Sequence, residues 1–212
     1  MGARLVREED GTPRRVGRIV ELEAYIGEAD RASHARFGPT GRNAVMYGPP
    51  GRAYVYLVYG MYDCLNIVTE PAGHPAALLV RAVEPLTGFE AMRAARLERW
   101  RSRRRAASAD ADAGEADRLD RLPDVRLASG PGLVAAAFAI DRSLTGTDLT
   151  APASPLRIEL APADDPPPSV ATGPRLGIDY AGSPWTDVPW RFWLNGHPSV
   201  SGTRRRDRRP AS

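Results

Sequence analysis

The stretch AYVYLVYGMYDCLNIVTE, residues 53–70, does most to determine the fold expected for this chain. Aromatic and β-branched side chains dominate it, and such side chains are typical of β-strands. The pattern is interrupted at Tyr59-Gly60-Met61, where the glycine suits a tight turn. The stretch therefore predicts two strands that form a hairpin around residues 59–61.

A further strand is predicted on the N-terminal side, over residues 14–26, RRVGRIVELEAYI. Apolar and polar side chains alternate there with the period of two that strands require. One face should pack against the core, and the other carries Glu21, Glu23 and Tyr25. Residues 28–51 are rich in Gly, Pro and polar side chains and predict a long loop, which is uncommon unless the loop is functional.

On the C-terminal side, residues 76–84 predict a mostly apolar strand that carries one charge, Arg81. Thr87 and Glu90 fit a capping box that opens a helix. Ser129-Gly130-Pro131 opens a second helix, because proline is favoured just inside a helix start. Short strands are expected near 156–160, 174–178 and 190–195. The expected class is α+β, with a curved, mostly antiparallel sheet and flanking helices.

Composition alone predicts that two segments lie outside this core. Residues 101–121 are rich in Arg, Ala and Asp and predict a solvated loop. The last ten residues carry five arginines and one aspartate, a charge of +4, whereas the whole chain carries +3. We therefore expect one domain over residues 1–202, with a charge near zero, and a disordered arginine-rich tail over 203–212.

Several classes of protein are excluded or disfavoured. The 212 residues include one cysteine, so no intramolecular disulfide can form. The sequence has no long apolar run and no secretory signal, no metal-ligand spacing, no phosphate-binding glycine loop and no serine-hydrolase elbow. All 29 basic residues are arginine, so the side-chain amine that Schiff-base chemistry needs is absent. We expect a cytoplasmic protein without a membrane span, metal or cofactor.

The polar and aromatic residues around the predicted strands have two interpretations. In the first, the glutamates face solvent and the tyrosines, Tyr54, Tyr56, Tyr59 and Tyr62, pack within a core hairpin; composition alone favours this one. In the second, the same residues form a pocket with aromatic walls and a carboxylate at its floor. Such a pocket suits a flat ring that must be stacked and attacked with the help of a base.

The sequence resembles the alkyladenine (3-methyladenine) DNA glycosylase family. The resemblance runs from about residue 3 to residue 201 and rests on five segments in order: RIVELEAY, SHAR, YVYLVYGMYDCLN, LLVRAVEPLTGFEAMR and SGPGL. It implies a single α+β domain with a protruding β-hairpin. It also implies a monofunctional glycosylase that flips damaged purines out of double-stranded DNA and releases them by hydrolysis, which starts base excision repair.

The resemblance assigns roles to individual residues. Glu23 matches the general base that activates water, and Arg81 matches the arginine that helps to hold this water. Spacing alone cannot choose between Glu23 and Glu21, which share a strand face. The expected base pocket comprises Tyr25, His34, Tyr56 and Asn66, of which Asn66 should exclude guanine. Tyr59 at the hairpin tip is expected to intercalate, and contacts to the DNA backbone are expected from Arg36, Arg42 and Met61.

The expected substrates are 3-methyladenine, 7-methylguanine, hypoxanthine and ethenoadenine in duplex DNA, and the expected state is a monomer. One departure is Leu133, at a position where a lysine often contacts phosphate in the family. Two rival functions remain at this point. A non-catalytic nucleic-acid-binding module would share the fold. A hydrolase of free nucleosides would share the pocket but would have no use for an intercalating hairpin.

Overall fold

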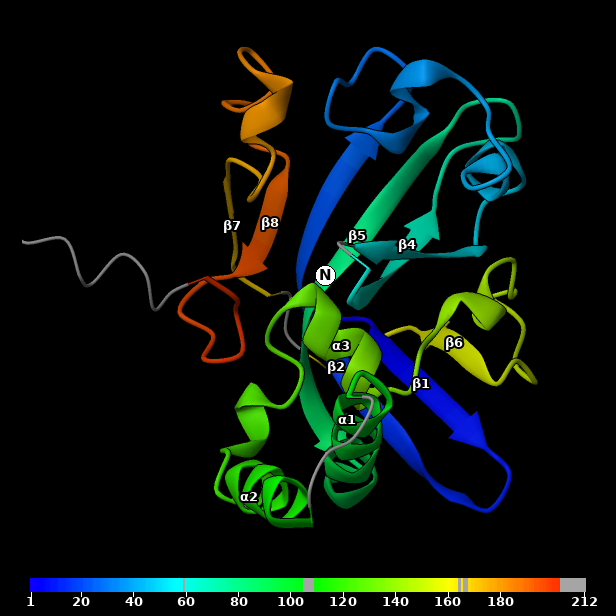
Figure 1. The fold of residues 1–212 in the computed structure, drawn as a ribbon. Coiled ribbons are helices and arrows are strands. Elements are labelled where there is room, and N and C mark those ends of the chain that lie inside the picture. The colour runs from blue at the N-terminus through cyan, green and yellow to red at the C-terminus, as the bar shows by residue number, and fades with distance from the viewer. Residues whose placement is uncertain (59, 105–108, 164, 166–167, 203–212) are drawn as a thin grey trace, which may run out of the picture.

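The computed structural model describes residues 1–58, 60–104, 109–163, 165 and 168–202 (Figure 1). Tyr59 and the tail over 203–212 therefore lie outside the described residues. Three α-helices are described: α1 (Phe89–Ser102), α2 (Ala109–Asp120) and α3 (Pro131–Ala137). Short 3₁₀ turns lie at His34–Phe37, Ala44–Tyr47, Asp124–Arg126, Arg142–Leu144 and Asp179–Ala181.

A single antiparallel sheet forms the centre of the molecule. Its strands are β1 (Arg4–Glu9), β2 (Thr12–Ile26), β3 (Ala53–Val58), β4 (Tyr62–Val68), β5 (Ala76–Thr87), β6 (Leu156–Glu159), β7 (Val170–Gly173) and β8 (Arg191–Leu194). The strand order is β3-β4-β5-β2-β1-β6, and β8 pairs with both β2 and β7. The described residues thus confirm the mixed α+β class, the antiparallel sheet and the β3–β4 hairpin. That the hairpin protrudes stays a prediction.

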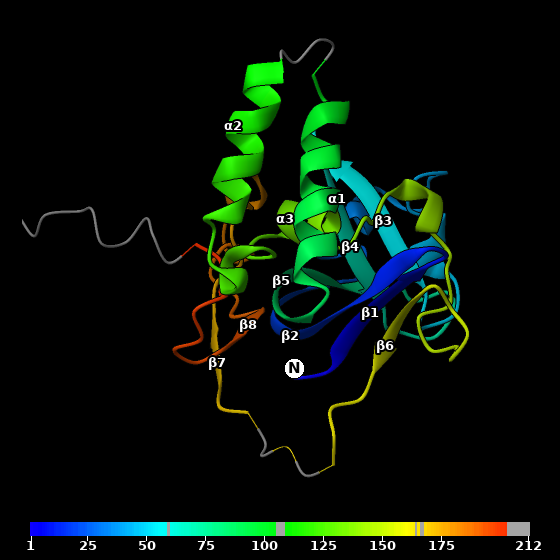
Figure 2. The ribbon, with the colours of Figure 1, turned by 90° about the horizontal axis from the view of Figure 1, so that it is seen from below.

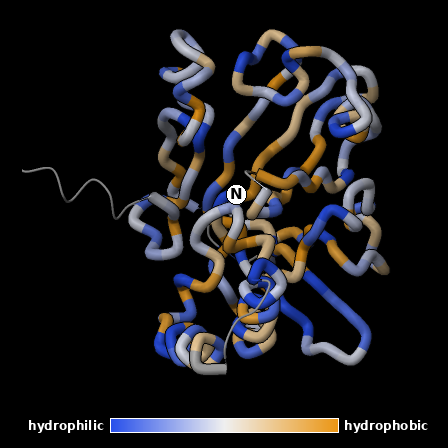
Figure 3. The backbone as a smooth tube through the Cα atoms, viewed as in Figure 1, coloured by the Kyte–Doolittle hydropathy of each residue, from blue (hydrophilic) through white to orange (hydrophobic). Residues whose placement is uncertain are grey.

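The main core lies between the sheet and the helices α1 and α3. Val83 on β5, Met92 on α1 and Phe138 just after α3 are fully buried there. Figure 2 shows α1 and α3 on one face of the sheet, with α2 beside α1. Figure 3 shows the apolar segments gathered where these helices meet the strands. These helices do not fill the end of the sheet that carries β3, β4 and the loop after β2. The cavity described below lies at that end.

Strand β2 is central, and this position corrects one expectation. It pairs with β5 along most of its length, with β1 at its start and with β8 at Glu21–Glu23. Glu21 and Glu23 consequently have no exposed surface. The interpretation that these glutamates face solvent is wrong, because Arg81, Arg191 and the backbone on either side of β8 enclose the two carboxylates.

Two local predictions also differ from the structure. Residues 109–120 form the helix α2, not a loop: Leu119 is buried, and Arg93 of α1 donates to the Leu119 carbonyl oxygen at 3.2 Å. Helix α1 begins without the predicted capping box, since its N-cap is Gly88, with φ of 81° and no side-chain cap. A Cβ at Gly88 would lie 2.5 Å from the Arg14 carbonyl oxygen, so the close approach of β2 requires glycine.

Candidate active site

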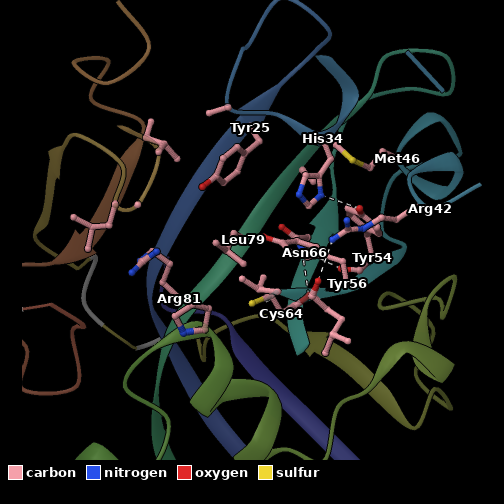
Figure 4. A pocket seen from close by; sticks show the side chains of 18 of the residues that line it. Tyr25, His34, Arg42, Met46, Tyr54, Tyr56, Cys64, Asn66, Leu79 and Arg81 are labelled. Carbon is pink, nitrogen blue, oxygen red and sulfur yellow. Dashed lines mark hydrogen bonds between the residues drawn. The ribbon is translucent and has the colours of Figure 1, made fainter. Parts of the chain in front are cut away.

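A cavity of about 390 Å³ opens between the β3–β4 hairpin, the loop after β2 and the segment before β8 (Figure 4). Its walls combine aromatic rings with a few polar groups, as small-molecule sites commonly do. The lining side chains that bear on chemistry are Tyr25, His34, Arg42, Tyr54, Tyr56, Cys64, Asn66, Arg81 and Tyr180. All four residues expected to form the base pocket therefore line one cavity.

Two buried carboxylates lie behind one wall of this cavity, and Arg81 joins them. Its Nε donates to Glu21 Oε1 at 3.0 Å and its Nη1 to Glu23 Oε2 at 3.2 Å. Burial acts to lower the pKa of Arg81, but the charges of Glu23 and Glu21 outweigh it and raise that pKa. Arg81 therefore stays protonated and fixes the positions of both carboxylates.

The two glutamates differ in what surrounds them. Glu23 accepts hydrogen bonds from the Tyr25 hydroxyl at 2.9 Å and from the Leu176 backbone N–H at 2.7 Å, and both residues line the cavity. Glu21 accepts instead from Arg191 Nε at 2.7 Å and the Ser201 backbone N–H at 2.6 Å, away from the cavity. Geometry thus favours Glu23 as the group that acts on a bound molecule.

Tyr25 connects the carboxylate to the cavity. Burial, followed by the charge of Glu23, raises the pKa of its hydroxyl well above the usual range. The phenol therefore remains neutral and donates its proton to Glu23 in a hydrogen bond. Because Tyr25, Arg81 and Leu176 cover the carboxylate, Glu23 lies one side chain behind the cavity wall and not on the open floor that the sequence suggested.

The opposite wall is an aromatic cluster. The His34 ring lies edge-on to Tyr56, with centroids 4.3 Å apart, and its Nδ1 is 2.9 Å from the Tyr54 hydroxyl oxygen. Burial, with the nearby charges of Arg42 and Arg36, lowers the pKa of His34 to about 4. The imidazole is therefore neutral at physiological pH, and the positive charge on this side of the cavity comes from Arg42 over the Tyr56 ring.

Comparison with known proteins gives this arrangement a context. A sequence model of methylpurine-DNA glycosylases matches residues 1–198, nearly the whole described chain. The chain belongs to the methylpurine-DNA glycosylase family. Accordingly, it is a DNA glycosylase, an enzyme of DNA base excision repair that hydrolyses N-glycosidic bonds in DNA. The non-catalytic alternative is not favoured.

Three relatives assigned as 3-methyladenine DNA glycosylases illustrate the similarity. A protein of Anaeromyxobacter dehalogenans strain 2CP-1 is 45% identical over 195 residues, which are 91% of this chain and 73% of the relative. One from Methanocella arvoryzae is 44% identical over 184 residues, 87% and 78% of the two chains. One from Bacillus cereus is 41% identical over 205 residues, 95% and 90% of the two chains.

Asn66 of the glycosylase is fixed by the hairpin backbone. Its side-chain nitrogen donates to the carbonyl oxygens of Tyr54 at 3.1 Å and Cys64 at 3.3 Å. It is 3% exposed, and Figure 4 shows it between Tyr56 and Leu79. A side chain with so little freedom is suited to restrict the shape of what enters the cavity.

The residues expected to contact the DNA backbone lie outside the cavity floor. Arg42 is exposed, donates to the Leu57 carbonyl oxygen at 3.1 Å and stands over the Tyr56 ring. The Arg36 guanidinium lies 4.6 Å from the centre of the Phe37 ring. Met61, next to the hairpin turn, is 49% exposed. Arg42 and Met61 are thus exposed and Arg36 is half-buried, and the contacts of all three with DNA remain predictions.

Sequence reasoning missed one part of the glycosylase site, the segment before β8. The Arg175 side chain has no exposed surface, and two of its nitrogens pair with Asp30, at 2.6 and 2.9 Å. Its guanidinium also lies 4.7 Å from the centre of the Tyr25 ring. The sequence shows only an arginine within a segment that was predicted to be a strand, and no motif or spacing singles it out.

Neither a candidate metal cluster nor a membrane-spanning helix occurs among the described residues. No group of three or more His, Cys, Asp or Glu side chains there is placed to hold a metal ion. No helix in the described part of the chain is long and apolar enough to cross a membrane.

The depressed pKa of His34 makes the stability of the glycosylase depend on pH. An unfolded histidine takes up a proton below about pH 6.5, whereas folded His34 does so near pH 4. The unfolded state is therefore favoured progressively as the pH falls from about 6.5 to about 4. We expect His34→Gln to lose less stability than the unchanged protein over this range in urea unfolding. Equal losses in both proteins would contradict the shift.

Proposed function

We propose that this glycosylase excises 3-methyladenine, 7-methylguanine, hypoxanthine and ethenoadenine from duplex DNA, with Glu23 as the general base. The observation that carries the proposal is the position of Glu23 directly behind the cavity wall, bonded to two cavity-lining residues and to Arg81. The cavity volume of about 390 Å³ is near the lower end of the range for small-molecule sites, about 300–1,000 Å³. It therefore suits a single base.

The aromatic walls would hold the flipped base by stacking. Each stacked base contributes about 1–3 kcal/mol, which offsets the few kcal/mol that flipping costs. Tyr25 stands on one side of the cavity and the cluster of His34 and Tyr56 on the other (Figure 4). Because both tyrosines and the neutral imidazole are uncharged, the same walls accept neutral hypoxanthine and cationic alkylpurines.

Hydrolysis requires a water molecule and a place for its proton. Glu23 Oε2 already accepts two hydrogen bonds, whereas Oε1 accepts one, from Leu176. The second lone pair of Oε1 is then the acceptor for the water proton. The oxygen of this water forms a bond to the sugar C1′, the bond from C1′ to the base nitrogen breaks, and the base leaves with the electron pair. An abasic site remains.

The proposal is tested on duplexes that carry one hypoxanthine or one ethenoadenine, and on DNA treated with a methylating agent. We expect breaks at the lesion only after alkali, and none in an undamaged duplex. Binding to all three duplexes without breaks would support the non-catalytic module instead. Release of bases from free nucleosides at equal efficiency would support the nucleoside hydrolase. We also propose that Tyr59 is the residue that intercalates into the duplex. The enzyme is proposed to be a monomer of the cytoplasm that acts on the nucleoid.

Asn66→Gly should relax the discrimination against guanine. The change removes a side chain that the backbone holds rigidly against the cavity, so a purine with a 2-amino group gains room. We expect guanine excision from mismatched sites to rise, while hypoxanthine excision changes less. The measurement is the ratio of the two single-turnover rates. An unchanged ratio would mean that another part of the cavity excludes guanine.

The enzyme should not form a covalent imine with DNA. A glycosylase that also cleaves the strand attacks C1′ with an amine, and this chain contains no lysine. Borohydride present during turnover on the hypoxanthine duplex should therefore trap no protein–DNA adduct. An adduct in proportion to the enzyme would overturn the water mechanism.

A further inference from the structure

A second cleft lies on the other side of the β3–β4 hairpin from the base cavity. Its volume is about 610 Å³, and Gly60 and Met61 of the hairpin turn form one side of it. The C-terminal end of α1 and the turn at Arg142–Leu144 form the other side. Leu57 borders both this cleft and the base cavity, so the hairpin is the wall between them.

Three arginines surround this cleft: Arg99, Arg103 and Arg142. We call Arg103 and Arg142 the cleft arginines. Asp63, which is 3% exposed, pairs with Arg99, and its Oδ1 lies 3.9 Å from Arg142 Nε. Oδ1 has no hydrogen-bond partner in the described part of the chain. One buried carboxylate thus draws two guanidinium groups to the base of the hairpin.

The remaining charges of the cleft are not balanced. Asp141 accepts hydrogen bonds from the backbone N–H and the hydroxyl of Ser143, at 2.8 and 2.5 Å, and so holds the turn that carries Arg142. Among the described residues, Arg103 pairs with no carboxylate; its guanidinium stacks 4.3 Å from the centre of the Tyr62 ring. Arg103 and Arg142 are both exposed. Such groups match phosphate, which arginine binds through two nitrogens.

The location of the cleft indicates which phosphates it meets. Figure 2 shows the C-terminal end of α1 and the end of β3 on the same side of the molecule. With the damaged strand at the base cavity, as the proposed function has it, the other side of the hairpin would face the opposite strand. We propose that the cleft arginines bind backbone phosphates of the strand opposite the lesion. This step rests on the proposed function, because it requires the flipped base to enter the cavity.

The test is the double variant Arg103→Gln/Arg142→Gln, which leaves the buried pair of Asp63 and Arg99 intact. Its control is Arg118→Gln/Arg121→Gln, which makes the same charge change at exposed sites near the far end of α2. The salt dependence of binding is measured on an undamaged duplex and on a hypoxanthine duplex. We expect the slope of log K against log salt to become shallower by about 1 for each lost contact. The control should keep the original slope.

A second set of duplexes identifies the strand. Uncharged methylphosphonate linkages are placed near the lesion, either in the damaged strand or in the opposite strand. Linkages in the opposite strand should weaken binding by the unchanged enzyme, so that it no longer binds more tightly than the double variant. Linkages in the damaged strand should leave this difference in affinity in place.

Three results would overturn the inference. The first is an unchanged slope in the double variant, and the second is an equally shallow slope in the control. The third is that methylphosphonate linkages in the damaged strand abolish the difference in affinity between the unchanged enzyme and the double variant. Excision at saturating enzyme is the separate readout for the proposed function. If the unchanged enzyme fails to release hypoxanthine, the lesion assignment is wrong, whereas the slope on undamaged duplex still reports whether the cleft arginines contact phosphate.

Discussion

Glu23→Gln is expected to reduce the rate of hypoxanthine excision by about 10²–10⁴-fold, the usual contribution of a general base. Glutamine keeps the size of the side chain but cannot accept a proton at neutral pH. Binding to the lesion duplex should change little, because Tyr25, His34 and Tyr56 still form the walls. The measurement pairs single-turnover excision with equilibrium binding. Full activity in this variant would remove Glu23 from the mechanism.

Glu21→Gln is the matched control. The partners of Glu23 are all hydrogen-bond donors, and so are those of Glu21. In either variant the new amide N–H₂ therefore faces another donor, which costs about 1–3 kcal/mol of stability. Both variants should unfold at a similarly reduced temperature. Only Glu23→Gln should lose the chemical step, and the reverse pattern would exchange the roles of the two glutamates.

Arg175→Met is expected to cause a large loss of stability. The change leaves Asp30 as a fully buried charge without its cation, and breaking such a pair costs about 3–5 kcal/mol. For a chain of this size the midpoint of thermal unfolding should fall by about 6–20 °C. Calorimetry measures the fall. Because the guanidinium also packs against the Tyr25 ring, excision should weaken even at temperatures where the variant remains folded.

The double variant Arg175→Met/Asp30→Asn separates charge from packing. Removing the orphaned carboxylate should restore part of the stability, since the remaining cost is lost packing and one lost bond to the Ala24 carbonyl oxygen. Excision should stay impaired, because the support behind Tyr25 is still missing. If the double variant is no more stable than Arg175→Met, the buried charge is not the source of the loss.

Local pattern was enough to predict the hairpin and the strand over β2, because their side chains alternate and their turn is marked by glycine. It was not enough for α2. Composition suggested solvation there, and the helix depends on one buried leucine and on ion pairs three and four residues apart, such as Arg118 with Glu115 and Arg121 with Asp117. A composition rule does not detect either feature.

The candidate site, like the fold, was predictable from the sequence only in part. Family resemblance assigned Tyr25, His34, Tyr56 and Asn66 to one base pocket. All four line one cavity, and that this cavity receives a base stays a prediction. The burial of Glu23 was not predictable, since it depends on β8 and on Leu176, about 150 positions away along the chain. Contacts between distant segments leave no periodic signal in either segment, and so Arg175 and Asp30 were missed as well.

The lone cysteine affects how the enzyme withstands the agents that create its substrates. Methylating agents are electrophiles, and among protein side chains the thiolate is a nucleophile that attacks them readily. Cys64 is 3% exposed, and burial raises the pKa of its thiol to about 12. At neutral pH the thiol is therefore almost entirely protonated. We therefore expect the thiol, although it lines the candidate cavity, to react slowly with such reagents, so that the enzyme withstands the damage that it repairs.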